Sequence, residues 1–214
     1  MRPARLALLL LLSSAPAPAF DEGVEAGLTI DRTHIDLDTG AELRITGATL
    51  FLTEELRPGF KLGLHGGALL LSQSGNAEAA GLEPTGFRLG VSAHGELFPQ
   101  HRFGLAGTLS YSYLRAEDSD ADRDLTIALH LARAELAGQL RLNGSRLQLG
   151  AYALHIDGDE TLAGTPNRSR PLAADRGTGG FIQADLWVDP TGRVSLRLDG
   201  GARQAAALSF ARLF

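Results

Sequence analysis

Most of the chain alternates apolar and polar residues with a period of two. In FKLGLH, residues 60–65, phenylalanine and leucine alternate with Lys61, Gly63 and His65. Successive side chains of a strand point to opposite faces, so this pattern predicts a strand with one apolar face. Similar runs occupy 35–37, 43–52, 60–71, 87–98, 103–113, 146–156, 181–188, 193–201 and 205–214. With segment 124–142, the sequence predicts about ten strands of about 9 to 14 residues, near the length with which a tilted strand crosses a bilayer.

Segment 124–142 also fits a helix. Leu125, Leu129 and Leu136 lie at helical spacing, and the alternation of period two slips before Leu136. The Asn143-Gly144 pair that follows is a hairpin signal, and the neighbouring segments are strands. We therefore expect one long strand with a β-bulge at the slip, and a helix is the alternative.

The gaps between these runs alternate in length. They are short at 54–59, 97–101, 143–145 and 189–192, and long at 72–86, 116–123 and 157–180. This alternation is typical of an antiparallel up-and-down transmembrane β-barrel with short periplasmic turns and longer outer loops. Bulky aromatics flank the short gaps, as at a membrane interface: Phe51, Phe60, Phe98, Phe103 and Trp187. The all-β fold class follows, with about ten strands and eight as the alternative.

The first residues have the features of an export signal. Arg2 and Arg5 precede an apolar run, and Ala17-Pro18-Ala19 is a small-x-small cleavage site. We predict a signal peptide over 1–19 and a single β-barrel domain over 20–214. Cleavage would take the formal net charge from −5 to −7, because two arginines are lost. This acidic balance argues against a nucleic-acid partner.

The signal peptide, the alternating strands and the C-terminal phenylalanine resemble those of the small outer-membrane β-barrel proteins of Gram-negative bacteria. The resemblance implies a place in the bacterial outer membrane, in contact with its lipid and lipopolysaccharide. It also implies that the last strand is an assembly signal, read by the barrel-assembly machinery through Phe214, Phe210 and Leu208. Arg212 departs from that pattern, where an apolar residue is usual.

The polar face of the strands is predicted to line a narrow lumen. The residues expected there are Lys61, His65, Arg88, His94, Glu96, Arg102, Asp185, Arg193, Arg197 and Asp199. Unpaired charge in so narrow a space is costly, so these side chains should pair and fill it. A wide pore is therefore not expected.

No catalytic, cofactor-binding or metal-ligating residue is predicted. The acidic segment 117–124 resembles the start of a calcium loop, but Arg123 stands where that loop needs glycine and Leu129 where it needs glutamate. Weak divalent cation binding in a solvated outer loop is the expectation for this segment.

These features favour a structural or interaction role, or narrow solute passage, without catalysis. One alternative is a soluble periplasmic barrel that binds a small apolar ligand inside. Another is an outer-membrane lipid-modifying enzyme that uses Ser92 and His94, which share a strand face. The exposure of Leu62, Leu64, Leu196 and Leu198 would separate the soluble barrel from the membrane barrel.

Overall fold

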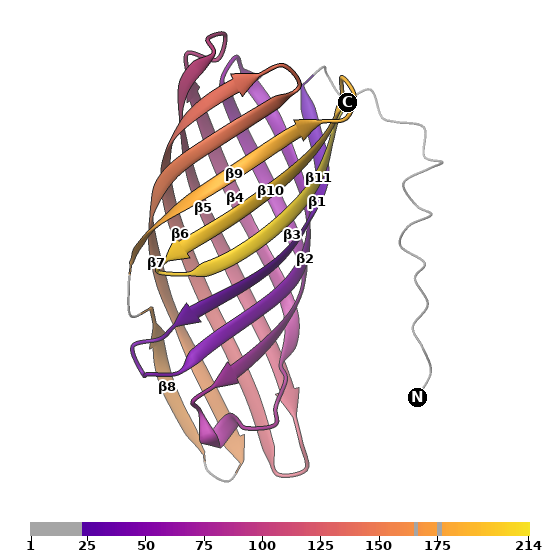
Figure 1. The fold of residues 1–214 in the computed structure, drawn as a ribbon. Coiled ribbons are helices and arrows are strands. Elements are labelled where there is room, and N and C mark those ends of the chain that lie inside the picture. The colour runs from indigo at the N-terminus through magenta and orange to yellow at the C-terminus, as the bar shows by residue number, and fades with distance from the viewer. Residues whose placement is uncertain (1–22, 165–166, 175–176) are drawn as a thin grey trace, which may run out of the picture.

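The computed structural model describes residues 23–164, 167–174 and 177–214, and these form a closed antiparallel β-barrel of ten strands with one extra strand (Figure 1). The predicted signal peptide lies outside the described residues. The strands are β1 (Val24–Asp36), β2 (Glu42–Arg57), β3 (Phe60–Ser74), β4 (Thr85–Leu97), β5 (Phe103–Ser119), β6 (Arg123–Leu142), β7 (Ser145–Gly164), β8 (Arg168–Ala173), β9 (Thr178–Trp187), β10 (Gly192–Gly201) and β11 (Gln204–Leu213). A short 3-10 helix, η2 (Ala77–Ala79), lies between β3 and β4. In the described part of the chain, no helix is long and apolar enough to cross a membrane.

The barrel closes where the last strand pairs with the first. β11 lies antiparallel to β1, with Phe210 opposite Leu28 and Leu208 opposite Ile30. On the other side, β7 pairs with β9 over 145–153 and with β8 over 157–162. β8 and β9 therefore occupy one position in the barrel, one after the other.

The two ends of the barrel differ (Figure 1). The C-terminal end carries Phe214 and the connections β2–β3, β4–β5, β6–β7 and β9–β10. The hairpin end carries the connections β1–β2, β3–β4, β5–β6 and β7–β8. The short gaps of the sequence lie at the C-terminal end, where Gly59 and Gly144 adopt positive φ angles of 78° and 71° in their turns. The turn at Ala202–Arg203 lies about midway along the barrel (Figure 1), and it returns β11 to the C-terminal end.

Most of the expected long loops are paired strand instead. β5 continues to Ser119 and β6 begins at Arg123, so the acidic segment 117–124 is the tip of a tight hairpin. Asp120 accepts hydrogen bonds there from Arg123, and this guanidinium holds the pKa of Asp120 below its usual value. The expected loop at 157–180 likewise holds the end of β7 and all of β8. The expectation of loops was wrong at 116–123 and 157–180, because strand pairing continues past the point where the apolar pattern changes. Between β3 and β4 it is confirmed, since residues 75–84 form a longer connection that contains η2.

β6 is one continuous strand, and the expected bulge is absent. Its pairing with β5 and β7 runs without a register shift. The slip in the sequence pattern arises because the apolar face changes sides: Leu125 and Leu129 point inward and are buried, whereas Leu136 points outward and is 64% exposed. The inward positions of this part of β6 are mostly polar, at Arg133, Glu135 and Gln139, with Ala137 between the last two.

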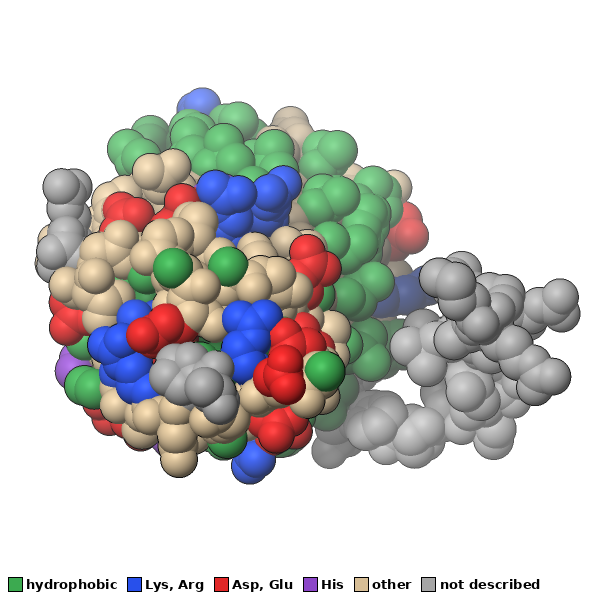
Figure 2. Space-filling model, turned by 90° about the horizontal axis from the view of Figure 1, so that it is seen from below, with side chains coloured by type: hydrophobic (Ala, Val, Ile, Leu, Met, Phe, Trp, Pro, Cys, Tyr) green, Lys and Arg blue, Asp and Glu red, His purple; other side chains and the backbone are tan. Residues whose placement is uncertain are grey.

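The same face exchange occurs on the other long strands. On β7, Leu147 and Leu149 point outward, but farther along Ile156 is buried inside and Asp157 and Asp159 are exposed outside. β1, β2, β3 and β5 follow this rule, with buried inward side chains Ile35, Leu43, Ile45, Leu69, Leu71 and Leu114 near the hairpin end. The barrel therefore has an apolar outer band toward its C-terminal end and an apolar core inside its hairpin end. Figure 2 views the hairpin end, where charged and polar side chains cover the tip and hydrophobic ones lie around the side.

Four leucines were expected to distinguish a membrane barrel from a soluble barrel, and all four point outward. Leu62, Leu64, Leu196 and Leu198 are 43%, 61%, 51% and 48% exposed. The expected place of Phe51 in the aromatic rim was wrong. Its side chain points inward against Gly27, where a β-carbon would lie 2.4 Å from the Phe51 ring. Phe98, Phe103 and Trp187 are exposed at the C-terminal end.

Candidate functional site: the lumen

The structure places nine of the ten residues predicted for the lumen on inward-facing strand positions. They are Lys61, His65, Arg88, His94, Glu96, Asp185, Arg193, Arg197 and Asp199. Arg102 lies elsewhere: it is exposed in the turn before β5, where its guanidinium carbon is 6.0 Å from the centre of the Phe103 ring. The inward-facing residues form two charged clusters, one near the middle of the lumen and one near the C-terminal end.

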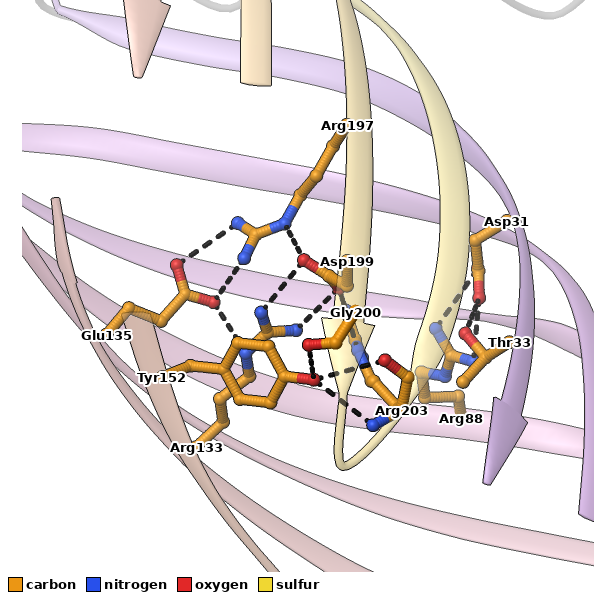
Figure 3. Close-up of polar contacts among 10 residues, drawn as sticks. All are labelled: Asp31, Thr33, Arg88, Arg133, Glu135, Tyr152, Arg197, Asp199, Gly200 and Arg203. Atoms are coloured by element: carbon orange, nitrogen blue, oxygen red, sulfur yellow. Dashed lines mark hydrogen bonds and ion pairs between the residues drawn. The ribbon is translucent and has the colours of Figure 1, made fainter. Parts of the chain in front are cut away.

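The central cluster is built around Asp199 of β10, whose side chain is 1% exposed (Figure 3). Arg133 of β6 donates to both of its carboxylate oxygens, with nitrogen–oxygen distances of 3.1 Å. Arg197 donates to it through Nε at 2.9 Å. Arg203, in the β10–β11 turn, donates through Nε at 2.8 Å. Three guanidiniums thus share one carboxylate, which is possible because two carboxylate oxygens offer about four acceptor sites.

Glu135 is the second acceptor of this cluster. Its carboxylate oxygens lie 2.9 and 3.1 Å from the terminal nitrogens of Arg197, and 2.7 Å from Nε of Arg133. Both guanidiniums also stack on aromatic rings: Arg133 lies 4.1 Å from the ring centre of Tyr152, and Arg197 lies 3.9 Å from that of Phe181. Ion pairs and cation–π contacts together hold both arginines across the lumen.

A separate ion pair lies beside this cluster. Arg88 of β4 donates to both carboxylate oxygens of Asp31 of β1, at 3.2 and 3.4 Å (Figure 3). Beside it, Nε2 of His65 lies 2.9 Å from the Ser112 hydroxyl oxygen. Gly90 makes room for this ring, because a β-carbon at that position would lie 2.3 Å from Nε2 of His65.

The second cluster, at the C-terminal end, centres on Glu96 and Asp185. Arg146 joins the two, with nitrogen–oxygen distances of 2.8 Å to Glu96 and 2.7 Å to Asp185. Arg141 also donates to Glu96, and Arg193 donates to Glu25 and lies 3.4 Å from Asp185. This cluster contains three arginines and three carboxylates, and so its charges balance.

His94 belongs to this second cluster. Its Nδ1 lies 2.9 Å from the Thr108 hydroxyl, and its Nε2 lies 3.2 Å from Glu96. Among the described residues, no hydrogen bond joins Ser92 to His94, the pair that the sequence offers to an enzyme. The Thr108 hydroxyl, the His94 imidazole and the Glu96 carboxylate lie in a row here. The Glu96 carboxylate, however, is already paired with Arg141 and Arg146.

The described part of the chain contains no group of three or more His, Asp or Glu side chains placed to hold a metal ion. The acidic tip at 117–124 is instead internally paired, through Asp120 and Arg123.

Many of the charged partners were not singled out from the sequence. Glu25, Asp31, Arg133, Glu135, Arg141, Arg146 and Arg203 were missed. Arg133, Glu135 and Arg141 lie in segment 124–142, where the expected bulge left the inward positions undefined. Continuous alternation across the slip would have placed all three on one face.

The comparisons with known proteins identify the fold. No protein-family model and no curated protein sequence matches the chain. Its structure is similar to the translocator domain of the autotransporter NalP from Neisseria meningitidis, with a TM-score of 0.55 and 10% identity over 92% of this chain and 90% of that chain. It is also similar to the outer membrane protein OprG from Pseudomonas aeruginosa, with a TM-score of 0.50 and 13% identity over 90% and 96%. The chain therefore has the fold of outer-membrane β-barrels.

Removal of the Asp199 carboxylate should strongly destabilise the barrel. Asp199→Ala leaves three arginines of the lumen without their shared acceptor, and breaking a buried pair costs about 3 to 5 kcal/mol of unfolding free energy. Asp199→Asn, which keeps a hydrogen-bond acceptor, should cost less. Glu117→Ala is the matched control: the Glu117 side chain is 56% exposed in a pair with Arg115, worth less than about 1 kcal/mol. Urea unfolding in detergent micelles measures all three variants, and an equal cost for Asp199→Ala and Glu117→Ala would contradict the role of the cluster.

Proposed function

We propose that the protein is an outer-membrane β-barrel with a sealed lumen, and that its role is structural or one of interaction with other molecules and is carried by the hairpin end. The exchange of apolar faces along the strands carries this proposal. Outward-facing leucines suit lipid, and the polar outer face of the same strands nearer the hairpin end suits water.

The height of the apolar band fits a membrane. On β5 the outward side chains are apolar or aromatic from Phe103 to Tyr113, with Gly107 among them, and charged at Arg115 and Glu117. About ten residues of strand, at about 3.3 Å each and tilted by about 40°, rise about 25 Å, which is the height of the lipid-facing band of such barrels. A soluble barrel would instead expose about 25 Å of apolar wall to water.

The lumen is closed in two layers, which argues against a channel. The charged clusters cross it in the lipid-facing half, and the apolar core fills it near the hairpin end, where Leu43, Leu71 and Leu129 have no exposed surface. Narrow solute passage is therefore the less favoured form of the proposal.

In the proposed orientation, the C-terminal end faces the periplasm and the hairpin end faces outward. Export through the signal peptide would deliver the chain to the periplasm. The hairpin end then presents acidic side chains, among them Glu117, Asp118, Asp157 and Asp159. Such a surface suits divalent cations that bridge it to the phosphates of lipopolysaccharide.

A charge placed in the middle of the band should reveal the lipid contact. Leu149 points outward near the centre of the band, so Leu149→Arg should cost about 2 to 4 kcal/mol of unfolding free energy in phospholipid bilayers. Thr161→Arg, on the outward face of the same strand beyond the band, should change it by less than about 0.5 kcal/mol. Urea unfolding in vesicles measures both variants. Similar costs at the two positions would rule out the proposed membrane boundary.

The purified, refolded protein should show no ion conductance in planar bilayers. Two layers of side chains block the lumen, so current should stay at baseline although the barrel is inserted, as shown by its resistance to protease in vesicles. Regular conductance steps from the inserted wild-type protein would favour solute passage over a sealed barrel.

Deletion of Phe214 should lower the amount of protein in the membrane without unfolding the barrel. Phe214 is exposed, and its backbone N–H donates to the Val24 carbonyl at the barrel seam. If the barrel-assembly machinery recognises the terminal aromatic, the truncated chain should accumulate in the periplasm, whereas its unaided refolding into detergent should match wild type. Arg212→Ala, which keeps Phe214, is the control. Normal membrane levels after the deletion would contradict the assembly role.

A further inference from the structure

A small cavity of about 60 Å³ lies inside the lumen, between the central charged cluster and the apolar core. On one side it is lined by leucine and isoleucine side chains, including Leu131. The polar residues that line it are Thr33, Arg88, Ser110, Ser112, Arg133 and Arg203. Its wall thus combines three guanidiniums with three hydroxyls.

No carboxylate is among the described residues that line this cavity. The carboxylates that pair with the three arginines are Asp31, Glu135 and Asp199, which Figure 3 draws and which do not line the cavity. Each guanidinium carries five N–H donors. Arg88 lines the cavity and uses two of its five donors on Asp31, which leaves three for another acceptor.

The residues around the cavity also carry surplus positive charge. The ion pairs near it join four arginines, Arg88, Arg133, Arg197 and Arg203, to three carboxylates, Asp31, Glu135 and Asp199. The cluster at the C-terminal end is balanced, with three of each. Within the part of the chain that the structure describes, the surplus therefore coincides with the cavity. Uncompensated charge is costly in a closed lumen.

We propose that this cavity binds a small inorganic anion such as chloride. Thr33 already donates to Asp31, and the Ser112 hydroxyl contacts His65. An anion accepts from the remaining guanidinium donors and from the Ser110 hydroxyl and cancels the surplus charge, whereas water supplies acceptors but no charge. A water molecule needs about 10 to 15 Å³ of such volume, so the cavity has room for a monatomic anion with a few waters. This inference rests on the fold and the lumen geometry and does not depend on the proposed cellular location.

The sealed lumen determines how the site fills. The apolar core closes the cavity toward the hairpin end, and the charged clusters close it toward the C-terminal end. The anion should therefore enter as the barrel folds and exchange slowly afterwards. Anion binding should appear as anion-dependent stability, because a ligand that binds only the folded state shifts the folding equilibrium.

The test uses bromide, a halide that can be located by anomalous scattering. The full chain without its predicted signal peptide is refolded into detergent micelles in sodium bromide or in sodium gluconate at equal concentration. Above its dissociation constant, each tenfold rise in bromide should lower the unfolding equilibrium constant about tenfold, and gluconate, which is too large for the cavity, should not. In crystals grown with bromide, an anomalous peak should lie in the cavity between Arg88, Arg133 and Arg203.

Two serine variants separate this site from general salt effects. Ser110→Val removes a hydroxyl and fills part of the cavity, and should abolish the bromide dependence. Ser92→Val is the matched control, because Ser92 lies directly opposite Ser110 on β4 and does not line this cavity. The control should keep the wild-type bromide dependence.

Equal stability in bromide and gluconate, with anomalous peaks only on the protein surface, would overturn the proposal. So would a bromide dependence that survives unchanged in Ser110→Val. If that variant does not fold, the anomalous peak and the bromide series of the wild-type chain still decide the question.

Discussion

The exchange of apolar faces partway along the strands is the constraint on which the rest of the structure depends. A barrel wall has two faces, and each strand supplies both through alternate residues. Where the wall meets an apolar surrounding, the leucines point outward and the polar residues must pair inside. Beyond that band the outer face meets water, so apolar residues such as Ile127 and Ile156 turn inward. Both the charged clusters and the apolar core follow from this exchange.

The exchange also defines what could be predicted from the sequence. Alternation within a run depends on one strand alone, so the all-β fold and the strand number could be predicted. The slip before Leu136 is a change in surroundings, which a single-strand pattern cannot distinguish from a bulge. Ion-pair partners such as Arg133 and Asp199, on β6 and β10, depend on where distant strands face each other, and no local pattern contains that information.

The apolar core explains how most of the hairpin end projects as paired strands and not as long loops. β5, β6 and β7 extend past the outer band, where a single layer of strands would have a water-filled interior. Inward-facing leucines and isoleucines from these strands and from β1, β2, β3 and β8 fill that interior, and Leu172 of β8 is among the buried ones. Side chains from opposite walls thus pack as in a β-sandwich. This packing makes the end of the barrel a rigid surface.

The closed interior accounts for the cations that the chain uses. Lys61 is the only lysine in the sequence, and its partner Glu55 lies near the C-terminal end, where water can enter. The cations that bridge carboxylates across the lumen are arginines: Arg146 joins Glu96 to Asp185, and Arg197 joins Glu135 to Asp199. A planar guanidinium can contact two carboxylates at once and loses less hydration than an ammonium. Bridging of this kind needs fixed distances between the walls, so the clusters fill the lumen and also hold β6, β7, β9 and β10 at a constant separation.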